Sequence, residues 1–122
     1  MPMLKTKNLK SIFEQISEYW QPHIVGELNG QHVKAAKFKG QFPMHKHETE
    51  DEMFLVVKGE IEIEFTDYAR QLTEGEIIVI PKGVEHSPKS ENEAHVLLFE
   101  PISTLNTGDT ENKFTHTDLK QL

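Results

Sequence analysis

The stretch HKHETEDE at residues 45–52 decides how this chain folds. In an extended strand the side chains alternate between two faces, so His45 and His47 point the same way and can reach one ion. Glu52 ends a short acidic run and opens the apolar stretch MFLVV at 53–57. We therefore expect Glu52 at the start of the neighbouring strand, where its carboxylate lies within reach of the same ion.

A second stretch, PKGVEH at residues 81–86, supplies one more candidate ligand. It follows the apolar strand IIVI at 77–80, and its proline of fixed φ and its permissive glycine are a turn signal. His86 is distant from His45 in the chain, so the two can meet only in a sheet that closes on itself. Three imidazoles and one carboxylate suit a divalent transition metal. The predicted metal ligands are His45, His47, Glu52 and His86.

These residues fall into two motifs that resemble those of the cupins. The first cupin motif combines a glycine, an HxH pair, a glutamate and a second glycine; the second combines a glycine, P-x-G and a histidine. The matching positions are Gly40, His45, His47, Glu52, Gly59, Gly75, Pro81, Gly83 and His86. The chain departs from the family at Ser90, where an asparagine is usual, and by one residue fewer between Gly40 and His45. Neither departure involves a predicted ligand.

The resemblance implies an all-β fold, the double-stranded β-helix or jelly-roll barrel of the cupins. It also implies one bound divalent transition metal. Mn, Fe, Co, Ni, Cu and Zn all accept histidine and carboxylate ligands, so the ligand set does not select the ion. Function stays open, because this fold carries isomerases, epimerases, dioxygenases, decarboxylases, lyases, sugar-binding modules and storage proteins.

The rest of the sequence predicts one domain in three parts: a helical segment at 1–21, a barrel at 22–101 and a C-terminal arm at 102–122. Apolar residues at three- and four-residue steps predict a short amphipathic helix over 8–20. Alternating or apolar segments predict strands at 24–28, 31–39, 53–57, 60–65, 77–80 and 94–100. The Asn29-Gly30 pair predicts a tight hairpin turn.

Composition restricts the function classes. The net charge of −7 argues against a nucleic-acid surface, which needs clustered lysine and arginine. Cysteine is absent, so nitrogen and oxygen atoms must hold the metal. No apolar run approaches ~20 residues and the first residues lack a signal-peptide core, so we expect a cytoplasmic protein without a membrane partner. Arg70 is the sole arginine, which disfavours a phosphosugar held by an arginine cluster.

Three histidines and one glutamate leave positions open on the ion, where water, a small-molecule ligand or O₂ can bind. The predicted function is a small metalloenzyme that acts on an oxygenated small molecule by dioxygenase-like or isomerase-like chemistry. The alternative is a non-catalytic module that binds a sugar or other ligand through the metal. His95 is the candidate catalytic residue, because its strand face could point into the barrel; the other interpretation is a satisfied core or surface histidine.

Three apolar residues outside the predicted strands suggest a homodimer. Trp20, Leu105 and Phe114 have no evident home in so small a barrel, and family members of this size commonly pair through an edge strand. We expect the helix to pack outside the barrel or against a partner, and the arm to cover the barrel of a second subunit.

Overall fold

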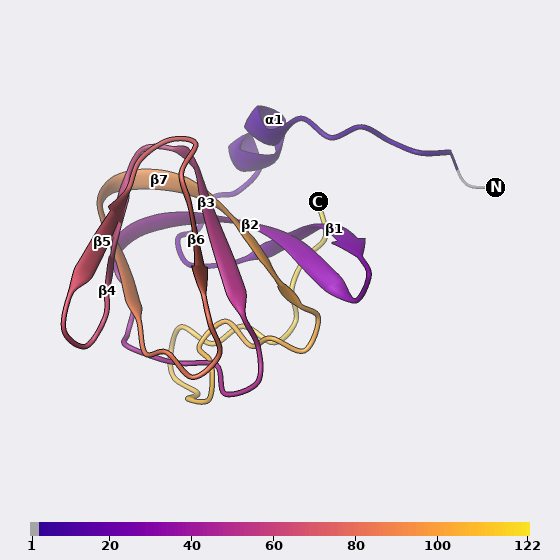
Figure 1. Ribbon diagram of the computed structural model, residues 1–122. Helices are drawn as coiled ribbons and strands as arrows, with labels where there is room; N and C mark the ends of the chain where they lie inside the picture. The colour runs from indigo at the N-terminus through magenta and orange to yellow at the C-terminus, as the bar shows by residue number, and fades with distance from the viewer. Residues whose placement is uncertain (1–2) are drawn as a thin grey trace.

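A computed structural model describes residues 3–122, and residues 1 and 2 of the predicted N-terminal segment lie outside that range. Antiparallel strands curl into a barrel, and a short helix lies outside it (Figure 1). The elements are α1 (Leu9–Glu14), β1 (His23–Leu28), β2 (Gln31–Gln41), β3 (Glu52–Lys58), β4 (Ile61–Glu64), β5 (Ala69–Leu72), β6 (Ile77–Ile80) and β7 (Ser87–Pro101). The predicted all-β class with a short N-terminal helix is confirmed.

Strand β7, with 15 residues, organises the sheet. Its second half lies between β2 and β3, so that Val96 pairs with Ala36 on one side and with Val56 on the other. Its first half pairs with β4 and with the end of β2. The strand order is β1-β2-β7-β3-β6, and β4 joins β5 to β7. Because one long strand belongs to both halves, the sheet bends over and encloses an interior (Figure 1).

Two pieces of this sheet were not predicted. Strand β7 begins at Ser87 rather than at residue 94, and β5 was not expected. Both pieces carry mostly polar side chains, and Leu72 is the buried residue of β5. Their strand conformation comes from pairing with β4, whose Ile61 and Ile63 are buried. Such pairing is a tertiary effect that local alternation does not report.

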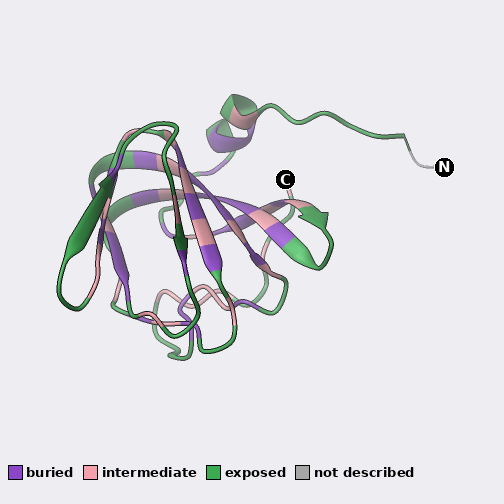
Figure 2. Ribbon diagram, viewed as in Figure 1, coloured by how far each residue is buried: buried purple, intermediate pink, exposed green. Residues whose placement is uncertain are grey.

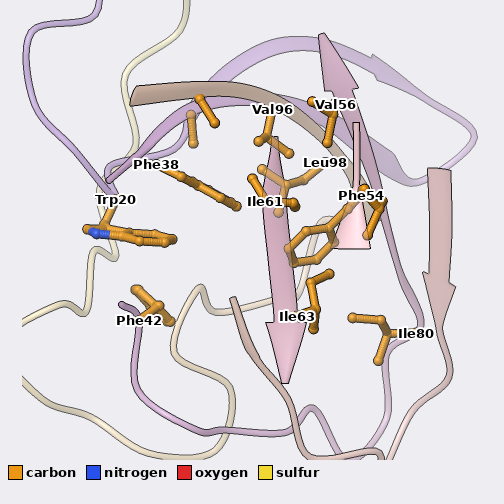
Figure 3. Packing of buried hydrophobic residues seen from close by; sticks show 13 residues of the cluster. Trp20, Phe38, Phe42, Phe54, Val56, Ile61, Ile63, Ile80, Val96 and Leu98 are labelled. Atoms are coloured by element: carbon orange, nitrogen blue, oxygen red, sulfur yellow. The ribbon is translucent and has the colours of Figure 1, made fainter. Parts of the chain in front are cut away.

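Alternate side chains of each strand pack on opposite faces of the sheet, and buried and exposed stretches alternate along the ribbons (Figure 2). The inward cluster fills the barrel (Figure 3) and consists of Trp20, Ala36, Phe38, Phe42, Phe54, Val56, Ile61, Ile63, Leu72, Ile80, Ala94, Val96 and Leu98. On the outer face, Ala35 and Leu97 pack against Ile12, Phe13 and Ile16. The helix therefore covers the outside of β2 and β7.

The helix is shorter than the predicted 8–20, and Trp20 is not part of its stripe. Asn8 caps α1 by accepting from the Ser11 N–H, and the helix ends at Glu14. Trp20 has a φ of 61°, which turns the chain inward, and its indole Nε1 donates to the Lys39 carbonyl at 2.8 Å. Its ring joins the barrel core instead of a helix face. In the described part of the chain, no helix is long and apolar enough to cross a membrane.

The C-terminal arm packs on its own barrel. The Phe114 ring lies 5.2 Å from the Phe42 ring between centroids, and Gln121 forms a bridge with Ile24 of β1. The Asp109 N–H donates to the Lys46 carbonyl at 3.1 Å, between two predicted metal ligands. The arm therefore covers the barrel of its own chain, and its contact with a second subunit stays a prediction.

The homodimer was inferred from three apolar residues for which the sequence predicts no packing partner within the barrel. The structure gives Trp20 and Phe114 positions in and against the barrel core, and Leu105 is half-buried. These residues no longer support the homodimer, which stays a prediction.

The tightest contact of the arm generates a prediction. Gly108 has a φ of 67°, and a Cβ placed on it would lie 2.0 Å from the Lys46 carbonyl oxygen. Gly30 has a similar φ of 75°, but a Cβ placed on it would have nothing within 4 Å. The variant Gly30→Ala therefore measures the cost of the positive φ alone. We expect Gly30→Ala to lower the free energy of unfolding by about 1 kcal/mol and Gly108→Ala by at least about twice as much. Urea unfolding measures both; equal losses would contradict the close packing of the arm.

Candidate metal centre

The backbone brings the first and last predicted ligands together. The His45 N–H donates to the His86 carbonyl at 3.0 Å, and the His86 N–H donates to the His45 carbonyl at 2.8 Å. The Gly83 N–H donates to the His47 carbonyl at 2.7 Å, which extends the same alignment. Glu52, the first residue of β3, pairs with Ile80 at the end of β6. The turn at 81–83 thus leads the chain from the end of β6, beside Glu52, to the segment that carries His45 and His47.

The four side chains converge inside the barrel. Ligand atoms from His45, His47, Glu52 and His86 all lie within 4.8 Å of one another, and every one of these residues is buried. The Glu52 Oε1 atom is 3.2 Å from His86 Nε2 and 3.5 Å from His47 Nε2. This is the cluster that the spacing predicts, and it can hold a metal ion.

Carbonyl groups fix the orientation of two imidazoles. His45 Nδ1 lies 2.9 Å from the Pro43 carbonyl oxygen, and His86 Nδ1 lies 2.9 Å from that of Val84. A carbonyl oxygen only accepts, so Nδ1 must carry the proton in both rings. The Nε2 lone pair is then free for a metal ion, as is usual for ligating histidines.

One buried atom indicates that the cluster fits an ion. His47 Nε2 is buried without a hydrogen-bond partner among the described residues. An unpaired polar atom in the interior costs roughly 1–3 kcal/mol, so such atoms are rare in folded proteins. A divalent ion bound by Nε2 would satisfy it. The donor set of three nitrogens and one oxygen fits a divalent transition metal.

Their surroundings keep the ligands in their metal-binding charge states. Burial, assisted by the nearby His86, lowers the pKa of His45 to about 4, so its imidazole is neutral at pH 7. Burial alone would raise the pKa of the Glu52 carboxyl, but its interaction with Glu100 and the nearby imidazoles of His47 and His86 hold it well below its usual range. Neutral imidazole and ionised carboxylate are the forms that bind metals.

His95 does not lie with these ligands. Its ring stacks on Phe13 at 4.5 Å between centroids, and its Nε2 is 2.8 Å from Glu93 Oε2. Val96 and Leu98 face the barrel interior, so His95 faces outward, under the helix segment. The expectation that His95 points toward the metal is wrong. Both faces of this strand are apolar because the helix covers the outer one, and alternation therefore could not tell the inside from the outside.

Two charged residues inside the barrel were not predicted. Lys34 Nζ and Glu100 Oε1 lie 2.8 Å apart, with side chains only 1% and 2% exposed. Glu100 also contacts Glu52, and burial, together with the charge of Glu52, raises the pKa of Glu100 well above its usual range. The available signal was the period of β2, which puts Lys34 on the same face as Ala36 and Phe38. Because lysine is almost never buried, this two-residue period alone did not predict an inward position for Lys34.

An apolar pocket adjoins the ligands. Its cavity volume is about 30 Å³, and part of the pocket is open to solvent. It is lined by Trp20, Pro22, Ala36, Phe38, Phe42, His45, Phe54, Pro88, Leu98 and Asn106. Four of these side chains, Trp20, Phe38, Phe42 and Phe54, are labelled in Figure 3. His45 is the metal-ligand side chain in this lining, and the pocket therefore opens toward the cluster.

Family membership agrees with this geometry. Residues 33–100, more than half of the chain, match the family described as Cupin_2, a cupin domain. The protein belongs to this cupin family. The uncharacterized protein YdbB of Bacillus subtilis (strain 168) is 34% identical over 89 residues, which are 72% of this chain and 79% of YdbB.

Solved structures share the fold. A cupin-2 domain protein of Shewanella frigidimarina NCIMB 400 is 37% identical with a TM-score of 0.77, covering 78% of this chain and 93% of its own. Protein NMB1881 of Neisseria meningitidis is 36% identical with a TM-score of 0.73, covering 80% and 99%. The hydroquinone 1,2-dioxygenase PnpCD, crystallised with Cd²⁺ and 4-hydroxybenzonitrile, has a TM-score of 0.67, covering 83% and 79%; at 17% identity this likeness shows the fold alone.

The first prediction at this site concerns metal affinity. Replacing His47 by Ala should weaken metal binding by more than about 100-fold, because loss of a residue that merely supports a ligand already costs about 10–100-fold. His23→Ala is the matched control, because His23 is likewise a buried histidine but lies outside the cluster. Chelator competition and elemental analysis measure the effect. Equal metal content in the two variants would reject the ligand set.

The second prediction concerns pH and the metal-free protein. A histidine has an ordinary pKa near 6.5, and His45 titrates at about 4 when folded. Between these values the unfolded chain binds the extra proton, so stability is full above pH 6.5 and falls as the pH drops toward 4. His45 should account for about 3 kcal/mol of that loss.

Urea unfolding of chelator-treated protein from pH 7 to 4.5 tests this. His45→Gln should flatten the dependence, whereas His116→Gln, outside the cluster, should leave it unchanged. Identical slopes for wild type and His45→Gln would show that burial does not depress the His45 pKa.

Proposed function

We propose that this protein is a small metalloenzyme that acts on a neutral or weakly acidic oxygenated molecule with an apolar or aromatic part. The observation that carries the proposal is the contact between a buried three-histidine, one-glutamate cluster and an aromatic pocket. A divalent ion bound by this cluster would supply Lewis-acid or redox chemistry to an oxygen atom of the ligand. The cofactor proposed is one such ion, of Mn, Fe, Co, Ni, Cu or Zn.

The pocket residues would bind and orient the ligand. Trp20 and Phe38 are stacked at 4.3 Å between ring centroids, and the Phe42 ring lies 5.1 Å from Trp20. Flat apolar walls of this kind favour an aromatic ring over a hydrated sugar. Phe114 of the arm packs on Phe42, which lines the pocket, and would help to keep water away from a bound ligand.

Charge disfavours a phosphorylated ligand. None of the pocket-lining residues is lysine or arginine. Lys34 is engaged by Glu100, and Arg70 lies on β5 over the Tyr68 ring at 4.6 Å. A phosphate entering the pocket would lose its hydration without gaining a cation, and burial of an unpaired charge is strongly unfavourable.

A second candidate function is the non-catalytic binding module. The position of His95 favours it, because this residue cannot act on a ligand in the pocket from the outer face. Asn106 does not replace it, since its amide donates to the Phe114 carbonyl and accepts from the His116 N–H. Any proton transfer in the metalloenzyme would then fall to the cluster itself. We expect a small-molecule partner in either case, and no nucleic acid.

A ligand panel tests the substrate class. Catechols, flavonols and aliphatic diols are compared with phosphosugars by thermal shift on metal-loaded and metal-free protein. We expect aromatic diols to raise the melting temperature only when metal is bound. Ala36→Leu fills the pocket without touching a metal ligand, so it should abolish the shift and leave the metal affinity unchanged. Shifts by phosphosugars alone would overturn the proposal.

A turnover experiment separates the two functions. Each ligand that binds is incubated with O₂ and with protein loaded in turn with each of the six metals. The metalloenzyme predicts a product by mass spectrometry for at least one metal, with O₂ consumed in the dioxygenase-like case. Quantitative recovery of unchanged ligand with every metal would reject the enzyme and favour the binding module.

A further inference from the structure

Lys34 lies inside the barrel, at a position of β2 where the two-residue period of a strand predicts an apolar core residue. Along β2 the inward positions are Lys34, Ala36 and Phe38, and Lys34 is only 1% exposed. Its ammonium group is 2.8 Å from Glu100 Oε1 and 3.4 Å from the Thr104 carbonyl oxygen. Glu100, near the end of β7, is 2% exposed. This is a fully buried ion pair in a barrel of modest size.

Stability does not explain such a pair. Moving two charges out of water costs several kcal/mol for each ion, and well-packed apolar residues of similar volume are often as stable or more stable. Ion pairs of this chain that serve only solubility lie at the surface, as Lys89 and Glu64 do at 2.7 Å with side chains 38% and 34% exposed. A buried pair therefore requires another use.

The Lys34–Glu100 pair lies next to Glu52, the carboxylate ligand. Met53 of β3 pairs with Phe99 of β7, so Glu52 and Glu100 occupy neighbouring positions on the two strands, and both side chains are buried. Their carboxyl groups interact there. The Glu100 Oε2 atom has no N–H or O–H donor among the described residues. Glu52 in turn presents Oε1 to His47 and His86. The chain of contacts runs from Lys34 through Glu100 and Glu52 to the imidazoles.

We propose that Lys34 and Glu100 are positioning residues of the metal centre, which hold the Glu52 carboxylate toward the histidines and so set the affinity for the ion. The inference depends on the metal site of the proposed function, but not on catalysis. The Lys34 ammonium compensates the negative charge held by the adjacent Glu52 and Glu100 carboxyl groups, and Glu100 restrains the rotation of the Glu52 carboxylate. Residues that orient a metal ligand in this way typically contribute about 10–100-fold in affinity.

The first test compares buried and exposed pairs. Lys34→Met and Glu100→Gln keep the approximate shape of each side chain and remove the ammonium and the carboxyl group, respectively. Both should weaken Co²⁺ binding by about 10–100-fold in chelator competition. They should also alter the visible absorption spectrum of bound Co²⁺, because the carboxylate changes its position. Lys89→Met and Glu64→Gln at the surface pair should leave both readouts as in wild type.

A second test asks whether the pair acts through Glu52. In a Glu52→Ala background, Glu100→Gln should cause little further loss of Co²⁺ affinity, because the group that it positions is gone. Lys34→Arg keeps the charge and should retain most of the affinity, which also covers the case in which Lys34→Met fails to fold.

The outcomes are distinct. Lower unfolding free energy of the metal-free variants with unchanged Co²⁺ affinity and spectrum would mean a purely structural pair and would overturn the inference. Equal losses from Glu100→Gln with and without Glu52 would also overturn it. Failure of wild-type protein to bind Co²⁺ would reject the proposed metal centre itself, whereas normal binding by wild type and by both buried variants rejects only this inference.

Discussion

The architecture of the site depends on two backbone hydrogen bonds, exchanged between His45 and His86 at 3.0 and 2.8 Å. They join the segment that follows β2 to the residue that precedes β7, and so place imidazoles from distant parts of the chain side by side. Backbone groups have no alternative partners inside a barrel, so this pairing is obligatory once the sheet closes. The carboxylate arrives on β3, beside β7, and completes a cluster that no local segment could form alone.

The ligand set could be predicted because each motif is local. An HxH pair on extended backbone fixes a shared face, and P-x-G fixes the turn before His86. The rest required tertiary information. His95 was assigned inward although the helix makes both faces of β7 apolar, and Lys34 was not singled out because lysine is rarely buried. The arm lacks any period, so its docking through Gly108 has no sequence signal beyond the glycine itself.

The barrel interior contains an apolar region and a charged region. The lining of the aromatic pocket contains no residue that is charged at pH 7, since its one histidine, His45, is neutral there. In the charged region Lys34 and Glu100 form a buried ion pair against Glu52. The apolar region suits an uncharged ligand, and the charged region constrains the ligating carboxylate. Both arise from the same inward faces of β2 and β7, whose apolar and charged residues follow one another at two-residue steps.

The central claim is that three histidines and one glutamate bind one divalent ion. Anomalous diffraction from crystals grown with Co²⁺, recorded on both sides of the cobalt absorption edge, locates the ion directly. The account predicts one anomalous peak per chain, bonded to Nε2 of His45, His47 and His86 and to the Glu52 carboxylate. A crystal with cobalt bound elsewhere, or with no cobalt between these four side chains, would contradict it.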